Sequence, residues 1–310
     1  MTQPTAPEQQ ATDSLQQDIA PTPDVTSTAK DLAGNPSPFQ RNPLPTGTPQ
    51  GQQQPTASPV GDTTHFGYKT VRTEEKQQKV AEVFHSVAAK YDLMNDLMSL
   101  GIHRLWKDTL IRKIKPHAGQ RFLDVAGGTG DIAFRIAKAA GTADNITVSD
   151  INAHMLEVGK TRAIDHGFVN GATGGFSWVE ANAEALPFPD NSFDVYTISF
   201  GLRNVTHIDT ALREAFRVLK PGGRFFCMEF GHLDNVQLQK LYDLYSYAVI
   251  PPLGQYVTGD RDSYQYLVES IRAFPERSEL CKRLKAVKFD IATATPLSMG
   301  IVNIHEAWKY

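Results

Sequence analysis

The chain has 310 residues, enough for one domain or two. Its 31 Lys and Arg residues nearly balance its 34 Asp and Glu residues, so the overall charge does not favour binding to nucleic acid. The two cysteines, Cys227 in a predicted strand and Cys281 in a predicted helix, are expected to be reduced and buried, as in a cytosol-like compartment. No apolar run is long enough to cross a bilayer or to form the core of a signal peptide.

Residues 1–62 differ in composition from the rest of the chain. They contain 11 of the 19 prolines, many Gln, Thr and Ser residues, and six acidic residues against two basic ones. Such a segment cannot bury enough apolar surface to offset its chain entropy, so we expect a disordered tail followed by one domain over 63–310. A mitochondrial presequence is rich in Arg and poor in acids, unlike this segment, which favours a bacterial-type cytoplasmic protein.

Residues 63–114 are expected to supply helices that cover a sheet. The first helix places apolar residues on one face, with charged residues opposite: Val80, Val83, Phe84, Val87 and Tyr91. A second helix follows Asn95 and Gly101, runs to about Ile114 and is expected to bury Leu105, Trp106, Leu110 and Ile114. Because both helices precede the first strand, we expect them over the carboxyl edge of the sheet, where ligands bind in such folds.

A glycine-rich turn follows the first predicted strand, Phe122 to Val125. Apolar residues then recur at helical spacing from Ile132 to Ala140, and Gly141 ends that helix. The segment Ala126 to Gly130 is therefore a tight turn before a helix N-terminus. Its backbone N–H groups are unpaired, and the missing side chains let a ligand come close.

The residues around this turn narrow the kind of ligand. There is no Gly-Lys-Ser/Thr of a phosphate-binding P-loop, and the first glycine of a dinucleotide motif would fall on Ala126. Asp124 precedes the turn, and Asp150 closes the next strand, where a carboxylate typically binds ribose hydroxyls. An acid just before a loop of small residues resembles the S-adenosylmethionine site of class I methyltransferases. The alternative is that the glycines serve only close packing.

After the turn, strands and helices alternate. Strands are predicted at 145–151, 176–180, 193–200 and 224–230, with a helix capped by Asn152 that carries Met155, Leu156 and Ile164, and another at 208–219. Lys220-Pro-Gly-Gly223 is expected to be a turn between helix and strand. This alternation favours a doubly wound, mostly parallel sheet with helices on both faces.

Residues 232–275 interrupt the alternation with helices rich in Tyr and Leu. One face carries Leu238, Leu241, Tyr242 and Tyr245, Pro251 and Pro252 break the pattern, and a second face carries Tyr266, Leu267, Ile271 and Phe274. Ordinary core is the simplest interpretation, and a lid over an apolar substrate is the functional one. Two closing strands, about 287–294 and 300–308, are expected to form an antiparallel hairpin like that of class I methyltransferases, which makes seven strands in a Rossmann-like sheet.

Several long motifs in one order resemble the ubiquinone/menaquinone biosynthesis C-methyltransferases, and the likeness runs from about Thr63 to Tyr310. The segments that carry it are Thr64–Gly67, Val83–Val87, Tyr91–Trp106 (YDLMNDLMSLGIHRLW), Asn182–Asp194 (NAEALPFPDNSFD), Ile198–Asn204 (ISFGLRN) and Arg217–Gly223 (RVLKPGG). One departure is visible: the family usually has serine after Met228-Glu229-Phe230, and this chain has Gly231.

The resemblance implies methyl transfer from S-adenosylmethionine to a ring carbon of a polyprenyl benzoquinol, and often of demethylmenaquinol. Carried over by position, the cofactor contacts are expected to come from Asp124, Gly128, Thr129, Gly130, Asp150, Asn182, Ala183 and Ser199. A hydroxyl at Thr129 suits the methionine end, and an amide at Asn182 can bind the adenine edge. Ser199 would face the transferring sulfonium, or it is a plain strand residue.

The predicted catalytic residues are Arg203, Asn204, Tyr91 and Asp92. A ring carbon attacks well only when a neighbouring quinol oxygen loses its proton. Arginine is a poor base, so we assign Arg203 to stabilising the phenolate or holding a water that takes the proton. Tyr91, Asp92 or His85 could relay it. The structural alternatives are core packing for Tyr91, a helix cap for Asp92, a surface position for His85, and an ion pair of Arg203 with Asp194 or Asp209.

Other functions remain open. They are O-methylation of a quinone or phenol, and a scaffold that binds the cofactor without turnover; a dehydrogenase is disfavoured by the glycine spacing. The histidines lack metal-ligand spacing, and no metal site is expected. The expected partners are a polyprenyl quinol, the surface of the inner membrane through the 232–275 helices, and a quinone-biosynthesis complex or a homodimer. The mitochondrial matrix side of the inner membrane is the alternative location.

Overall fold

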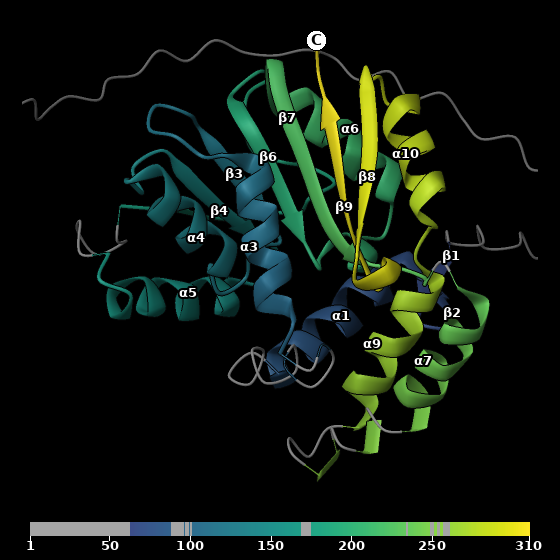
Figure 1. Ribbon diagram of the computed structural model, residues 1–310. Helices are drawn as coiled ribbons and strands as arrows, with labels where there is room; N and C mark the ends of the chain where they lie inside the picture. The colour runs from purple at the N-terminus through teal and green to yellow at the C-terminus, as the bar shows by residue number, and fades with distance from the viewer. Residues whose placement is uncertain are drawn as a thin grey trace, which may run out of the picture. The chain divides into compact units, whose positions relative to one another are not determined.

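A sheet of seven strands organises the computed structural model, in the order β5-β4-β3-β6-β7-β9-β8 (Figure 1). The strands are β3 Phe122–Val125, β4 Ile146–Asp150, β5 Ser177–Glu180, β6 Phe193–Ser199, β7 Leu219–Phe230, β8 Ile291–Leu297 and β9 Val302–Trp308. The first five in the spatial order are parallel, and β9 runs antiparallel between β7 and β8. The predicted mostly parallel, doubly wound sheet with its antiparallel end is confirmed.

The structure describes residues 63–87, 96, 99, 101–168, 175–233, 235–248, 251–252, 255–256 and 261–310. The predicted tail, residues 1–62, lies outside them.

Helices cover both faces of the sheet. One face carries α3 His103–Ile114, α4 Asp131–Ala140 and α5 Ala153–Asp165, and the other carries α6 Ile208–Val218 and α10 Arg277–Ala286. On the first face Leu110 and Ile136 belong to a buried cluster with Phe226, and on the second Leu212 and Leu280 belong to one with Tyr196. Coverage on both faces explains why β3 and β6, in the middle of the sheet, are buried along nearly their whole length. The sheet is therefore the rigid middle layer of three.

A third group of elements lies beyond the end of the sheet toward which β6 and β7 run (Figure 1). It consists of β1 Thr63–Phe66, β2 Lys69–Arg72, α1 Thr73–Val87, α7 Val236–Ala248 and α9 Arg261–Ala273. The hairpin of β1 and β2 was not predicted. The Phe66 ring stacks on Tyr266 of α9 with centroids 4.1 Å apart, and the backbone N–H of Tyr68 donates to Glu269 at 3.1 Å. Residues that precede the first strand of the sheet (β1, β2 and α1) and residues between β7 and β8 (α7 and α9) therefore form one cover over the carboxyl edge of the sheet.

Several local predictions are confirmed. Asn152 caps α5, because its side-chain oxygen accepts from the backbone N–H groups of His154 and Met155 at 3.0 and 3.2 Å. Gly141 ends α4 in the left-handed conformation. Tyr266, Leu267, Ile271 and Phe274 are all buried.

Three local predictions are wrong. Leu105 is 64% exposed, because the buried stripe of α3 runs through other positions. The segment Lys220–Gly223 belongs to β7, which pairs with β6 at Leu219, departs from it, and pairs again from Arg224. The expected turn is therefore an irregularity inside a longer strand. The strand expected from about 287 begins only at Ile291, because a turn follows the end of α10 at Ala286.

The end of β7 explains the unusual Gly231. A Cβ placed there would lie 2.1 Å from Nδ2 of Asn303 on β9 and 3.1 Å from the Gly300 carbonyl oxygen. The buried Asn303 amide thus occupies the space that a serine side chain would need.

We predict that Gly231→Ser lowers the free energy of unfolding by about 1–3 kcal/mol, because the new side chain overpacks the end of β7. Combining it with Asn303→Ala should restore most of the loss. Chemical denaturation of both single variants and the double variant measures this coupling. Single-variant effects that simply add would contradict the proposed steric cause.

Candidate active site

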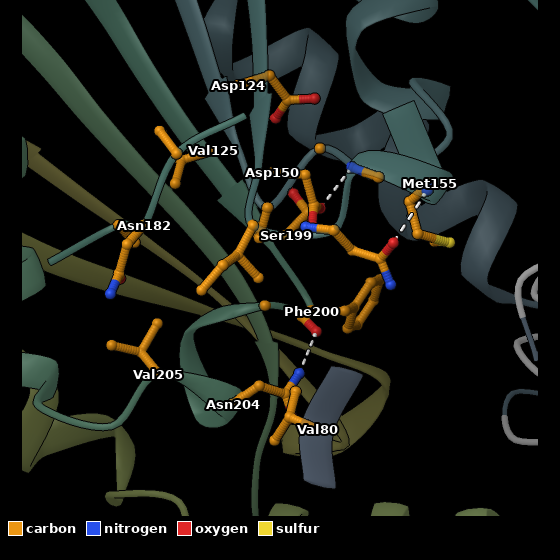
Figure 2. Close-up of a pocket in the computed structure, with 18 of the residues that line it drawn as sticks. Val80, Asp124, Val125, Asp150, Met155, Asn182, Ser199, Phe200, Asn204 and Val205 are labelled. Atoms are coloured by element: carbon orange, nitrogen blue, oxygen red, sulfur yellow. Dashed lines mark hydrogen bonds between the residues drawn. The ribbon is translucent and has the colours of Figure 1, made fainter. Parts of the chain in front are cut away.

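A pocket opens at the carboxyl ends of β3, β4 and β6 (Figure 2). The turn after β3, the first turn of α5 and the segment after β6 form its walls, and α1 closes it with Val80 and Ala81. The empty space at the site, counted together with the open space at its mouth, is about 1130 Å³. The predicted position of the covering helix α1 is confirmed.

The turn from Ala126 to Gly130 lies tightly against its surroundings. A Cβ at Gly127 would come within 2.7 Å of Val148 and 2.9 Å of Asp124 Oδ2, and Gly130 has a φ of 84°. Close packing therefore requires the glycines, and the same turn lines the pocket with backbone. The glycine-rich segment therefore both packs closely and leaves its backbone open to a ligand.

Asp124 is the most unusual group in the pocket. Its side chain is buried; Oδ1 accepts a hydrogen bond of 2.6 Å from Thr197, and Oδ2 has no partner among the described residues. Burial raises the pKa of the Asp124 carboxyl to about 7, and the Thr197 hydroxyl offsets this only in part. A buried carboxylate oxygen without a donor is costly unless a ligand supplies a positive charge.

Asp150 lies at the end of the neighbouring strand and holds the turn in place. Its Oδ2 accepts from the Gly128 N–H and its Oδ1 from the Asn152 N–H, both at 2.9 Å. Burial raises the pKa of Asp150 to about 6, against the effect of these backbone donors. Because the carboxylate lines the pocket beside the turn, it remains within reach of a ligand hydroxyl.

The other predicted cofactor contacts also line this pocket: Gly128, Thr129, Asn182, Ala183 and Ser199. Gly130 adjoins it as the residue that caps α4. The Thr129 hydroxyl already accepts a 2.7 Å bond from Arg162, and Asn182 Oδ1 accepts from the Glu184 N–H. The Ser199 hydroxyl is buried without a partner among the described residues. A ligand would therefore meet the Asn182 amide N–H₂ group and the Ser199 hydroxyl as available polar groups.

Arg203 lies behind the pocket rather than on its wall. Its side chain is buried, and Nη1 donates to Glu229 Oε2 at 2.9 Å and to the Phe200 carbonyl at 2.5 Å. The predicted ion-pair alternative was wrong about the partner, because Asp194 pairs with Lys220 and Asp209 with Arg283. Sequence patterns did not predict the contact between Arg203 and Glu229, because the two residues are 26 positions apart.

Asn204 does line the pocket, and contacts from the cover fix the segment around it. Its Oδ1 accepts a 2.9 Å bond from the Tyr266 hydroxyl of α9, and its Nδ2 lies 3.5 Å from the Phe200 carbonyl oxygen. Lys76 of α1 donates to the Val205 carbonyl at 2.9 Å. Helices α1 and α9 of the cover therefore each donate a hydrogen bond to the segment after β6.

The remaining predicted residues cannot be placed. Tyr91 and Asp92 lie outside the described residues, and the side chain of His85 is likewise not described. Sequence reasoning missed two pocket residues that form an ion pair, Lys107 and Asp131. The signal for Lys107 was its position on the buried stripe of α3, one residue after the predicted core residue Trp106.

The chain was compared with known proteins. A model of the ubiE/COQ5 methyltransferase family matches residues 72–309. The chain belongs to this family.

Individual relatives agree with that assignment. A ubiquinone/menaquinone biosynthesis C-methyltransferase of Rhodopseudomonas palustris is 55% identical over 252 residues, covering 80% of this chain and 98% of the relative. A mitochondrial 2-methoxy-6-polyprenyl-1,4-benzoquinol methylase of Drosophila melanogaster is 52% identical, covering 80% of this chain and 85% of the relative. Among solved structures, a methyltransferase of Thermotoga maritima matches the fold with a TM-score of 0.53, at 16% identity, over 74% of this chain and 99% of its own.

As a member of this family, the protein is an S-adenosylmethionine-dependent methyltransferase, and the pocket described above fits that cofactor. The unpartnered Asp124 oxygen suits a cationic group, the side-chain-free turn leaves space for the methionine end, and Asp150 can accept from ribose hydroxyls. In the described part of the chain no helix is long and apolar enough to cross a membrane.

We predict that cofactor affinity rises by up to about tenfold per pH unit as the pH increases toward about 7, because the bound cation favours the ionised form of Asp124. Binding near pH 6.5 should release a proton. Calorimetry in buffers of different ionisation enthalpy measures both effects. The Asp124→Asn variant is the control and should bind more weakly, with a flatter profile; an unchanged slope in this variant would remove Asp124 from the effect.

Proposed function

We propose that this enzyme methylates a ring carbon of a polyprenyl benzoquinol, of the 2-polyprenyl-6-methoxy-1,4-benzoquinol type, and of demethylmenaquinol, as a step of ubiquinone/menaquinone biosynthesis. The observation that carries the proposal is the 55% identity that extends over 98% of a quinone C-methyltransferase. The benzoquinol methylase, at 52% identity, supports the same substrate class.

The pocket walls support an aromatic, largely apolar substrate. Asp124 and Asp150 lie on one side, while Val80, Phe200 and Val205 surround Asn204 on the other (Figure 2). The first side suits a charged cofactor, and the second places apolar side chains around the Asn204 amide. A quinol head group needs such a surface, because its ring is apolar and its oxygens must be hydrogen-bonded.

S-adenosylmethionine, when bound, supplies a methyl group on a sulfonium that is already primed to leave. The protein's part is to align the ring carbon and to favour loss of the quinol proton. The ring carbon gains the methyl group and gives up its hydrogen as a proton. Asn204 is placed to hold the quinol oxygen through its Nδ2 group, because the Tyr266 hydroxyl occupies its Oδ1.

Arg203 supports this step from behind the wall. Its bond to the Phe200 carbonyl and its pair with Glu229 fix the segment that carries Asn204. The guanidinium also places a positive charge near the developing phenolate. We do not assign it the role of base, because a guanidinium gives up its proton poorly.

We predict that Arg203→Gln alone destabilises the fold by about 3–5 kcal/mol, because it leaves Glu229 buried without its cation. The double variant Arg203→Gln/Glu229→Gln should recover stability, since two amides can bond to each other. If the guanidinium charge assists methylation, the double variant binds cofactor nearly normally but has a greatly reduced kcat. Turnover at the wild-type level in the double variant would limit Arg203 to a structural role.

The function itself is tested by incubating the enzyme with labelled S-adenosylmethionine and short-chain benzoquinol or naphthoquinol analogues. Mass-spectrometric fragmentation should place the new methyl group on a ring carbon. A methyl group on oxygen would instead establish an O-methyltransferase. Cofactor binding without consumption, for any quinol offered, would favour a scaffold in a quinone-biosynthesis complex.

A polyprenyl quinol resides in a membrane, so the proposal includes peripheral contact between the cover and the inner membrane, whether in a bacterial or a mitochondrial setting. Leu244 on α7 is 65% exposed and Tyr256 is 89% exposed, both within the 232–275 segment. Large apolar side chains that face solvent favour insertion into lipid. Such membrane contact would leave room for a quinone-biosynthesis complex or a homodimer at the membrane.

We predict that Leu244→Glu combined with Tyr256→Glu reduces co-sedimentation with vesicles severalfold, because charged side chains resist entry into the lipid interface. Leu105→Glu is the matched control, since Leu105 is equally exposed (64%) but lies on α3 outside this segment. An equal loss of vesicle binding in the control would argue against a specific role of the cover. Unchanged binding of the double variant would exclude this surface.

A further inference from the structure

The pocket contains a buried lysine to which neither the family motifs nor the proposed mechanism gives a role. Lys107 lies on the inner stripe of α3, is 3% exposed and lines the pocket. Its Nζ lies 2.5 Å from Asp131 Oδ2. A lysine is seldom buried to this degree, because removing an ammonium from water is costly unless it is paired.

Asp131 is the ion-pair partner of Lys107 at the start of α4. Asp131 is the first residue of α4, and its other carboxylate oxygen accepts a 3.0 Å bond from Arg135. Burial acts to raise the pKa of Asp131, but the cations of Lys107 and Arg135 outweigh it and lower that pKa to about 2. The carboxylate is therefore ionised at neutral pH. An ammonium has three N–H donors, and the bond to Asp131 uses one of them.

A complementary group lies on the other side of the same turn. The Asp124 oxygen that lacks a donor and the Lys107 ammonium line one pocket, with the turn Ala126–Gly130 between β3 and α4. The positive end of the α4 dipole adds to the lysine's attraction for an anion. Beside the glycine-rich turn, the pocket thus combines a carboxylate that can bind a cation with an ammonium that can bind an anion.

We infer that Lys107 binds the α-carboxylate of the methionine end of S-adenosylmethionine, while Asp124 receives the α-ammonium. An amino-acid zwitterion requires one group of each sign, and these two are the complementary pair at the turn. The inference rests on the methyl-donor chemistry of the proposed function and is independent of the quinol. Lys107 would then be a specificity residue that distinguishes the intact cofactor from fragments lacking the carboxylate.

A purely structural role for Lys107 is the competing explanation, because its ion pair also joins α3 to α4. The two explanations differ in what they predict for different ligands. A structural defect weakens every ligand of the pocket alike. Loss of a carboxylate contact weakens only ligands that carry the carboxylate.

The test compares S-adenosylmethionine with decarboxylated S-adenosylmethionine, which keeps the sulfonium and the ammonium. For Lys107→Met we expect calorimetry to show about 10- to 100-fold weaker binding of S-adenosylmethionine, as for loss of a charge-assisted hydrogen bond, and less than threefold change for the decarboxylated ligand. Lys113→Met, on the same helix but paired with Glu306 away from the pocket, is the matched control and should alter neither affinity.

The double variant Lys107→Met/Asp131→Asn guards against misfolding, because it removes both charges of the buried pair together. It should show the same selective loss. Equal weakening of both ligands in the double variant, or no weakening of either, would overturn the inference. If wild-type protein shows the Lys107-dependent selectivity but methylates no quinol, the proposed function fails while this inference stands.

Discussion

A carboxylate buried at the end of a central strand is the constraint on which the site depends. Asp124 has one oxygen satisfied by Thr197 and one without a donor among the described residues, so this buried carboxyl is costly to ionise. A cationic ligand relieves that cost, which makes part of the folding energy available for binding. The neighbouring glycines follow from the same constraint, since a Cβ at Gly127 would collide with the Asp124 oxygen itself.

The second half of the site is held by long-range contacts rather than by local turn chemistry. The segment after β6 is fixed from beneath by Glu229 through Arg203, from α1 by Lys76 and from α9 by Tyr266. These three partners come from three different parts of the chain, so the segment is set only when the whole fold is complete. In the cofactor half the turn and the α5 cap are formed by sequence neighbours, although the bond from Thr197 to Asp124 spans 73 positions. In the substrate half all three contacts join residues far apart in the chain.

This difference explains how much the sequence could predict. The strand Phe122–Val125, its turn and the Asn152 cap were predictable because periodicity and capping are local signals. Which side of a helix is buried depends on its tertiary contacts, and the exposed position of Leu105 shows where that inference failed. The pairing of Arg203 with Glu229 joins residues 26 positions apart, and no local pattern encodes it.

The strand order determines when each strand can find its partner during synthesis. Within the described chain β8 pairs only with β9, and β9 lies between β7 and β8 although it is made last of the three. While the ribosome is still adding β9, β8 has no neighbour, and the edge of β7 is open. The β7 edge is covered only once β9 pairs with it, and until then an unpaired edge in the nascent protein is a site for aggregation.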